Sequence, residues 1–353
     1  MGNRSQLPRI WLIKAYRAGE YVQIQALAEA LGWPYEIKAL NYRKTEFRAS
    51  LFRRSDLRGI NIEKSSPLIP PWPDLVISAG MRNEPVCRWI RRQSAGRTAI
   101  VHLGRPWADL AQFDLVITTP QYRLPAHPNV LKNLLTLHRV TSERLQAEAW
   151  RWQPRLAALS LPRPFVAVIV GGNSGPYTFG PKTAARLARV ASAMALEKGG
   201  SLLVTTSART PPDASRELAR GITAPLHFYQ WRPDDDDNPY YAYLALADAI
   251  IVTAESISML SEACATGKPV YLFDMGDDHT VDKDFRWSAL FYRWLIHWGP
   301  KRLTRDISLI HRQIVEAGRA VWLGDVFPEH DLSPLDDLHR AVEGVRRLIV
   351  DKA

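Results

Sequence analysis

Cysteine is scarce in this chain of 353 residues, which contains only two, Cys87 and Cys264. Both lie in amphipathic stretches and are typical of small buried apolar residues. A disulfide framework and a cysteine-built zinc site are therefore excluded. The nine histidines show neither HExxH nor HxxxH spacing, so the sequence predicts no metal centre.

Long apolar runs are also missing. No stretch of about 18 apolar residues occurs, and the best candidate, 242–254, is interrupted by Asp248, so we expect no membrane-spanning helix. The opening residues, MGNRSQLPR, have no apolar core and no small-residue cleavage site, unlike a signal peptide. A cytoplasmic location is therefore expected.

Basic residues outnumber acidic ones, and the formal net charge is +10. Such a surface favours anionic partners, namely nucleic acid, anionic lipid or phosphorylated small molecules, although plain solvated arginine faces give the same balance. No nucleic-acid recognition module accompanies the charge, so nucleic acid is not expected as a partner.

Short apolar runs alternate with helical periods along the whole chain, which is typical of an α/β protein with parallel sheets. The predicted strands are 10–13, 75–77, 99–103, 115–118, 165–170, 201–205, 249–253 and 270–273. Prolines 154, 162 and 164 mark a linker. We expect two doubly wound Rossmann-like domains facing a cleft, with bounds 1–150, 151–164 (linker), 165–330 and 331–353 (C-terminal helix).

Ligands in such sheets bind beyond the carboxyl ends of the strands, so we expect the binding residues in the loops that follow the strands. The loop after 165–170 is Gly171-Gly172-Asn173-Ser174-Gly175, and a helix is predicted from about Pro181. Glycines let the backbone approach a phosphate, and Asn173, Ser174 and the backbone N–H groups can donate to it. The loop matches neither a P-loop nor the GxGxxG fingerprint.

Hydroxyl groups and one arginine follow the next strand, at 205–211. Ser207 and Arg209 can hold an anionic oxygen, and arginine does so through strong charge-assisted bonds. A plain turn that caps the following helix explains these residues equally well.

A carboxylate seam follows the strand 249–253. Ser256 is expected as an N-cap, and Glu255, Ser258 and Glu262 share one side of the next helix, beside Met259. Glu262 can accept hydrogen bonds from both ribose hydroxyls, each worth about 1.5–3 kcal/mol. The alternative is a solvent-facing Glu on a surface helix.

In the first half, Glu20 lies at the start of the predicted helix 22–31, after the strand 10–13. It is either held near a ligand or serves as a first-turn acid that the helix dipole stabilises by about 0.3–1 kcal/mol. The residues alone favour the second interpretation.

These pieces together resemble a known family. The segment 247–270 is similar to the donor-binding half of GT-B glycosyltransferases, and the whole chain resembles the "elongated mitochondria" family of fission-related proteins, which has many bacterial members. The family usually has Asp where this chain has Glu255, and Arg-Arg where it has Ala208-Arg209. The matching pieces are 18–20, Gln23, 71–77, Gly80, Arg82, 113–116, Asn129-Val130, 171–174, 205–211, 238–240 and 253–259.

The resemblance implies a GT-B-like fold and a nucleotide-sugar pocket, and it does not settle the activity. The first hypothesis is a glycosyltransferase with a nucleotide-sugar donor, no other cofactor, and a cell-envelope or lipid-linked acceptor. The glycine loop would hold the diphosphate and Glu262 the ribose. Glu20 or His102 would be the general base that faces the acceptor, with Glu20 favoured by its loop. Two alternatives are a non-catalytic scaffold that binds a protein or membrane and an epimerase, although the dinucleotide fingerprint and Tyr-x-x-x-Lys pair of epimerases are missing.

Two segments suggest attachment to an anionic membrane surface. Residues 42–58 interleave basic and aromatic side chains, which predicts peripheral binding at the inner face of the cytoplasmic membrane. Residues 285–298 are dense in aromatic rings, typical either of an interface belt or of a buried interdomain helix. GT-B folds often return their last helix to the first domain, so the helix starting at Ser333-Pro334 is expected to pack on the N-terminal half.

Overall fold

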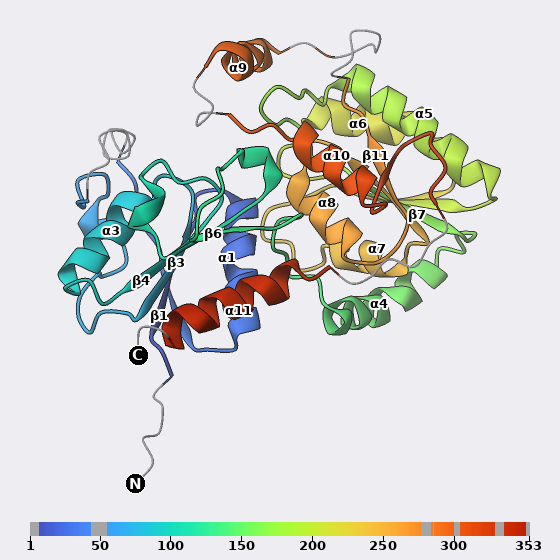
Figure 1. Cartoon of the computed structure of the whole chain (residues 1–353). Coiled ribbons are helices and arrows are strands. Elements are labelled where there is room, and N and C mark those ends of the chain that lie inside the picture. The colour runs from blue at the N-terminus through green and yellow to red at the C-terminus, as the bar shows by residue number, and fades with distance from the viewer. Residues whose placement is uncertain are drawn as a thin grey trace. The chain divides into compact units, whose positions relative to one another are not determined.

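The computed structural model describes residues 7–43, 55–276, 284, 286–299, 304–328 and 335–350. The chain divides into two compact units (Figure 1), unit 1 formed by residues 1–139 and 335–353 and unit 2 by residues 140–334. Each unit is built on a six-stranded sheet. The expected fold class, two doubly wound Rossmann-like domains, is confirmed.

All strand pairs of the unit 1 sheet are parallel. The spatial order is β2-β1-β3-β4-β5-β6, so the direction of winding reverses between β1 and β3. The strands are β1 (Ile10–Ile13), β2 (Tyr35–Lys38), β3 (Leu75–Ala79), β4 (Ala99–Leu103), β5 (Leu115–Thr118) and β6 (Val130–Lys132).

Helices cover both faces of the unit 1 sheet, which is why its inner strands are apolar on both sides. Helices α1 (Ala18–Leu31) and α11 (Asp337–Val350) share one core with the sheet, and α3 (Glu84–Gln93) packs into the other. Three short 3-10 turns complete the described part of the unit: η1 (Ile62–Lys64), η2 (Leu110–Gln112) and η3 (Pro120–Tyr122).

The unit 2 sheet is also parallel throughout. Its order, β12-β11-β10-β7-β8-β9, is the 3-2-1-4-5-6 arrangement of dinucleotide-binding folds, with the reversal between β7 and β10. The strands are β7 (Phe165–Ile169), β8 (Ser201–Thr205), β9 (Leu226–Tyr229), β10 (Ala249–Thr253), β11 (Val270–Phe273) and β12 (Val321–Trp322).

Helices α5 (Pro181–Glu197) and α6 (Pro212–Gly221) pack together over one face of the unit 2 sheet. Helices α7 (Tyr240–Leu246) and α8 (Ile257–Cys264) contact β7 and β10. The remaining described helices are α4 (Ser142–Ala157), α9 (Trp287–Trp298) and α10 (Ser308–Glu316).

The segment 151–164 differs from the expected linker, because residues 151–157 complete α4. Trp152 and Leu156 of this half are buried, and α4 packs on α7. One proline removes one backbone hydrogen bond, so Pro154 does not end a helix whose apolar side is covered. Unit 2 therefore begins at Val140 rather than after the prolines.

The last helix, α11, packs on α1, β4 and β5, within unit 1. Ser333 and Pro334 lie outside the described residues, and the helix begins at Asp337. The Asp337 carboxylate accepts hydrogen bonds from the backbone N–H groups of Leu134 (3.1 Å) and Leu135 (2.8 Å). Asp337 is only 8% exposed, and burial raises the pKa of its carboxyl group. This carboxylate attaches the start of α11 to the segment after β6.

Replacing Asp337 with Ala should lower the free energy of unfolding by about 1–3 kcal/mol, because two backbone N–H groups lose their acceptor. Urea denaturation measures this. The exposed neighbour offers a matched control, and Asp336→Ala should stay within about 0.5 kcal/mol of the unchanged protein. Equal effects of the two substitutions would contradict the proposed attachment.

Candidate functional site

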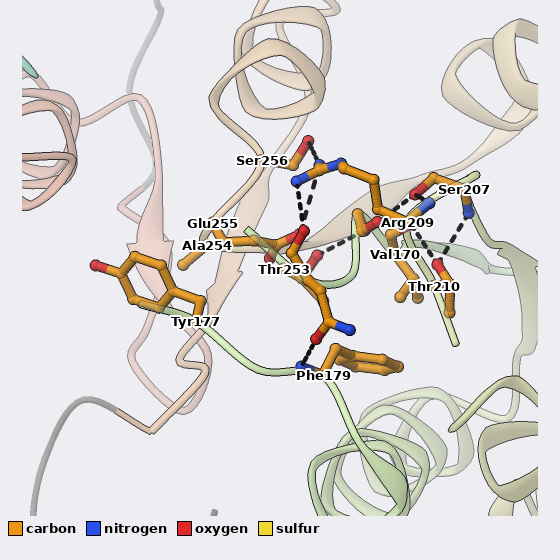
Figure 2. Close-up of polar contacts among 12 residues, drawn as sticks. Val170, Tyr177, Phe179, Ser207, Arg209, Thr210, Thr253, Ala254, Glu255 and Ser256 are labelled. Carbon is orange, nitrogen blue, oxygen red and sulfur yellow. Dashed lines mark hydrogen bonds and ion pairs between the residues drawn. The ribbon is translucent and has the colours of Figure 1, made fainter. Parts of the chain in front are cut away.

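Three loops meet at the reversal point of the unit 2 sheet. They follow the carboxyl ends of β7 (residues 170–175), β8 (206–210) and β10 (254–256), and Figure 2 shows their polar side chains directed toward one another. In doubly wound sheets this is the point at which a ligand has room between the diverging crossover connections.

Gly171 lies where the three loops come closest. A Cβ at this position would stand 2.0 Å from Glu255 Oε1, 2.7 Å from Ser256 Cβ and 2.9 Å from Arg209 Nη2. Its N–H donates to Thr253 Oγ1 at 2.8 Å. Gly172 has φ of +105°, and a Cβ there would stand 2.3 Å from the Arg209 carbonyl oxygen. Both glycines are therefore required by the close approach of the neighbouring loops.

The Arg209 side chain crosses from the β8 loop to the β10 loop (Figure 2). Its Nη2 donates to Ser256 Oγ at 3.2 Å and lies 3.8 Å from Glu255 Oε1, while Nη1 donates to the Asn173 carbonyl at 3.3 Å. The side chain is 40% exposed, so the guanidinium can still reach a ligand from solvent.

Glu255 is a buried carboxyl group beside this cation. The residue is 3% exposed, and its Oε1 lies 3.8 Å from Arg209 Nη2. Burial raises the pKa of Glu255 to about 7, although Arg209 acts in the opposite direction. The group therefore changes its charge near neutral pH.

The first turn of α8 faces the same loops. Ser256 is its N-cap residue, as expected, but its side chain makes no capping bond and accepts from Arg209 instead. The first intrahelical bond runs from the Leu260 N–H to the Ser256 carbonyl at 2.9 Å. The N–H groups ahead of it, which include those of the half-buried Ser258 and Met259, form a helix N-terminus suited to an anion.

Glu262 lies one turn further along α8 and is 7% exposed, so it is not a solvent-facing surface residue. Tyr240 Oη donates to Glu262 Oε2 at 2.5 Å, and Tyr241 Oη to Oε1 at 3.5 Å. Burial and the neighbouring carboxylate raise the pKa of Tyr240 well above its usual range. The two tyrosines therefore hold the carboxylate in a fixed orientation.

The expected phosphate cradle of the glycine loop needs a correction. The Asn173 N–H donates to the Arg209 carbonyl at 3.0 Å and the Ser174 N–H to the Tyr177 carbonyl at 3.1 Å. The Asn173 side-chain oxygen accepts from the Phe179 N–H at 2.9 Å. These groups stabilise the loop itself, and Gly175 packs against the Tyr292 ring. The glycine loop therefore leaves room for a ligand, but the Asn173 and Ser174 N–H groups are not free to donate to it.

Ser207 also has a structural task. Its hydroxyl donates to the Gly171 carbonyl and accepts from the Arg209 N–H at 3.2 Å. Its backbone N–H donates to Thr210 Oγ1 at 3.0 Å. Ser207 thus fixes the loop that directs Arg209, and Arg209 remains the group that can contact a ligand.

A cavity of about 650 Å³ adjoins the site. It lies against Ala254 and Asp274, the residues that follow β10 and β11, and Tyr177, Phe273 and Trp322 contribute aromatic walls. Cavities of this size and apolar character are typical of small-molecule sites.

In unit 1, Glu20 lies in the first turn of α1, at the reversal point between β1 and β3. Its Oε1 is 3.6 Å from Arg17 Nη1, and a Cβ on Gly80, which follows β3, would stand 2.8 Å from Oε2. The side chain is 20% exposed. Glu20 is thus the carboxylate positioned at the ligand-binding end of this sheet.

His102 was expected to face an acceptor from the end of a strand, and this expectation is wrong. The residue is the last but one of β4, but it has 0% exposure, its Nδ1 is 3.1 Å from Ser78 Oγ, and its ring packs on Phe113. Burial lowers its pKa to about 3, so it stays neutral. A general base must reach the hydroxyl that it deprotonates, and a core histidine cannot.

Sequence reasoning missed the two tyrosines that hold Glu262 and one arginine that fixes the glycine loop. Arg286 Nη2 donates to the carbonyls of Gly175 (2.7 Å) and Tyr177 (2.9 Å). The motif Asn238-Pro239-Tyr240 was a signal for the tyrosines, whereas nothing in the sequence connects Arg286 to residue 175.

The described residues hold neither a metal cluster nor a membrane-spanning helix. No group of three or more His, Cys, Asp or Glu side chains is arranged to hold a metal ion there. No helix in those parts of the chain is long and apolar enough to cross a bilayer. The core of the predicted membrane segment, 44–54, lies outside the described residues.

The fold defines a doubly wound α/β protein, and the loops after β7, β8 and β10 meet at the reversal point of its second sheet. The model of the family "Mitochondrial fission ELM1" matches residues 18–349. The chain therefore belongs to this family, as the sequence resemblance predicted.

Similar proteins include two curated relatives. The mitochondrial fission protein ELM1 of Arabidopsis thaliana is 31% identical over 64% of this chain and 56% of its own length, so the chain spans just over half of that relative. An uncharacterized protein of Rickettsia prowazekii, RP120, is 27% identical over 75% of this chain and 82% of its own. Among solved structures, the ADP-heptose lipopolysaccharide heptosyltransferase II of E. coli has a TM-score of 0.45 and 14% identity, over 98% of this chain and 99% of that one.

The raised pKa of Glu255 makes a prediction about stability. Since burial raises the pKa of Glu255 from its ordinary value of 4.5 to about 7 in the folded protein, the unfolded state ionises first and stability falls as pH rises through this interval. Glu255→Gln removes the ionisable group and with it the loss of stability at high pH. The free energy of unfolding of the variant, relative to that of the unchanged protein, should therefore increase by about 2–3 kcal/mol between about pH 5 and about pH 8.

Urea denaturation at the two pH values measures the gain. The exposed Glu197 at the end of α5 provides the control, and Glu197→Gln should change stability equally at both. A pH-independent effect of Glu255→Gln would show that the carboxyl group is not held in its neutral form.

Proposed function

We propose that this protein binds a nucleotide-sugar at the reversal point of the unit 2 sheet and transfers the sugar to an acceptor. The observation that carries the proposal is the meeting of Arg209 with the uncapped first turn of α8 above the Gly171 backbone. A cation and a helix N-terminus together favour an anion, and the glycines leave room for it.

The diphosphate fits this position. Arg209 supplies charge-assisted hydrogen bonds and the N–H groups of Ser258 and Met259 supply neutral ones. Glu255 lies beside the same space, and while protonated it can donate to a phosphate oxygen. Once ionised it repels the phosphate, so affinity is expected to fall as pH rises through about 7.

Two features of unit 2 suit a nucleoside. The carboxylate of Glu262, oriented by Tyr240 and Tyr241, suits the paired hydroxyls of a ribose. The cavity beside Ala254, with aromatic walls from Phe273 and Trp322, suits a planar base. These features support a nucleotide more directly than a simple phosphate.

Glu20 is the proposed general base toward the acceptor. It is a partly exposed carboxylate at the reversal point of its own sheet, which is where a ligand of unit 1 would bind. A cell-envelope or lipid-linked acceptor and a cytoplasmic location belong to this proposal.

A second candidate function is a non-catalytic scaffold that binds a protein or membrane partner. It is supported by the family itself, because the Arabidopsis relative is described as a mitochondrial fission protein. Nucleotide binding without sugar transfer would favour this candidate.

Replacing Arg209 with Ala should weaken binding of a nucleoside diphosphate about 10- to 100-fold, since hydrogen bonds to charged groups contribute about 1.5–3 kcal/mol. Isothermal titration calorimetry with UDP and ADP measures the affinity. Arg220→Ala, at the exposed end of α6, is the control and should bind as the unchanged protein does.

Glu262→Gln separates the nucleoside contact from the phosphate contact. It keeps the side-chain volume, and it should weaken nucleoside diphosphates without changing the affinity for inorganic pyrophosphate. Unchanged nucleotide affinity in both the Arg209 and Glu262 variants would place the ligand elsewhere.

Replacing Glu20 with Gln should reduce sugar transfer about 10²- to 10⁴-fold while nucleotide affinity stays the same, because general-base catalysis contributes this much to the rate. Transfer is followed as nucleoside diphosphate release with a panel of nucleotide-sugars and membrane extracts. Glu63→Gln, on an exposed turn of the same unit, is the control. An equal loss of nucleotide binding in Glu20→Gln would argue against a catalytic role.

A further inference from the structure

Helix α9 exposes the side chains that a helix normally buries. Trp287 is 78% exposed, Phe291 64%, Trp294 55% and Trp298 80%, while Ala289 is its only buried residue. In Figure 1, α9 stands away from the helices that cover the unit 2 sheet.

The four exposed rings form one stripe along the helix. Their spacing is i, i+4, i+7 and i+11, which places them on a single face. The rings of Phe291 and Trp294 stack with centroids 6.0 Å apart. We call these four residues the aromatic stripe. The opposite face, with Ala289 and Tyr292, is turned toward the protein.

The helix is fixed to the rest of unit 2 at its inner face. The Tyr292 ring lies against Gly175, and Arg286, directly before the helix, donates to the carbonyls of Gly175 and Tyr177. The outward direction of the aromatic stripe is thus set by contacts at the other side of the helix.

The sequence next to the stripe points to its occupant. Between residues 286 and 305 the sequence has five Lys or Arg residues and no acidic one, of which Lys301 and Arg302 lie outside the described residues, and the whole chain has a net charge of +10. Tryptophan favours the membrane–water interface, where the ring is in apolar surroundings and the indole N–H meets polar headgroups. Basic residues nearby are attracted by anionic lipid.

The length of the helix fixes how it would lie. Its 12 residues extend about 18 Å at 1.5 Å per residue, less than the roughly 30 Å of a bilayer core. A helix with this length and one apolar face lies in the plane of the interface rather than across it.

We propose that the aromatic stripe of α9 docks this protein on an anionic lipid surface, with the helix parallel to the membrane plane. The attachment is independent of nucleotide binding. The attachment places α9 at the lipid surface. This helix contacts the loop 175–177, and that loop directly follows the candidate site in the sequence.

The test is sedimentation with vesicles that contain about 30% anionic lipid or none, at about 50 mM and about 500 mM salt. The unchanged protein should sediment with anionic vesicles at low salt, and less at high salt or with neutral vesicles. The variant W287S/W294S/W298S should lose at least tenfold in partitioning, with unchanged thermal unfolding because these residues are exposed. Trp150, 83% exposed on α4, is the matched control, and Trp150→Ser should sediment normally.

Three outcomes would overturn the proposal. The first is that anionic vesicles fail to retain the protein at low salt. The second is that the triple variant sediments as the unchanged protein does, which would move attachment to the segment 42–58. A concentration-dependent dimer that the triple variant abolishes, without vesicle binding, would make the stripe an interface with a second copy.

Discussion

The carboxyl group of Glu255 lies so close to the backbone of Gly171 that any side chain at position 171 would collide with it. This close approach lets the loops after β7 and β10 meet at the reversal point, and it buries Glu255. A buried carboxyl group resists ionisation, whereas Arg209 beside it retains its charge and partial exposure. The site therefore presents a net positive surface to an anion below the pKa of Glu255, and the first turn of α8 adds to it.

The sequence predicted the interior of both sheets and missed their edges. The eight predicted strands correspond to β1, β3, β4, β5, β7, β8, β10 and β11, which lie between two neighbours. The missed strands are β2, β6, β9 and β12, one at each edge. Interior strands are covered on both faces and are continuous apolar runs, whereas the edge strands are partly exposed, so they lack this signal.

The sequence identified several residues of the candidate site, but it did not show which contacts those residues make. Glu262 and Arg209 were identified because charged residues after strands are distinctive, and Glu20 was found for the same reason. The predicted strand 99–103 already contained His102, but a strand buried on both faces has no alternation that shows whether a side chain near its end faces the core or a ligand. The roles of Asn173 and Ser174 depend on which N–H groups the folded loop already uses, and spacing alone carries no such information.

The most direct test of a nucleotide site at the reversal point is amide hydrogen exchange with and without a saturating nucleoside diphosphate. At a ligand concentration of about 100 times Kd, binding adds about 2.7 kcal/mol of stability. The account predicts that protection increases at 171–173, 207–210 and 256–262, and not at the control segment 115–118 of unit 1. Protection confined to other segments, or none at saturation, would contradict it.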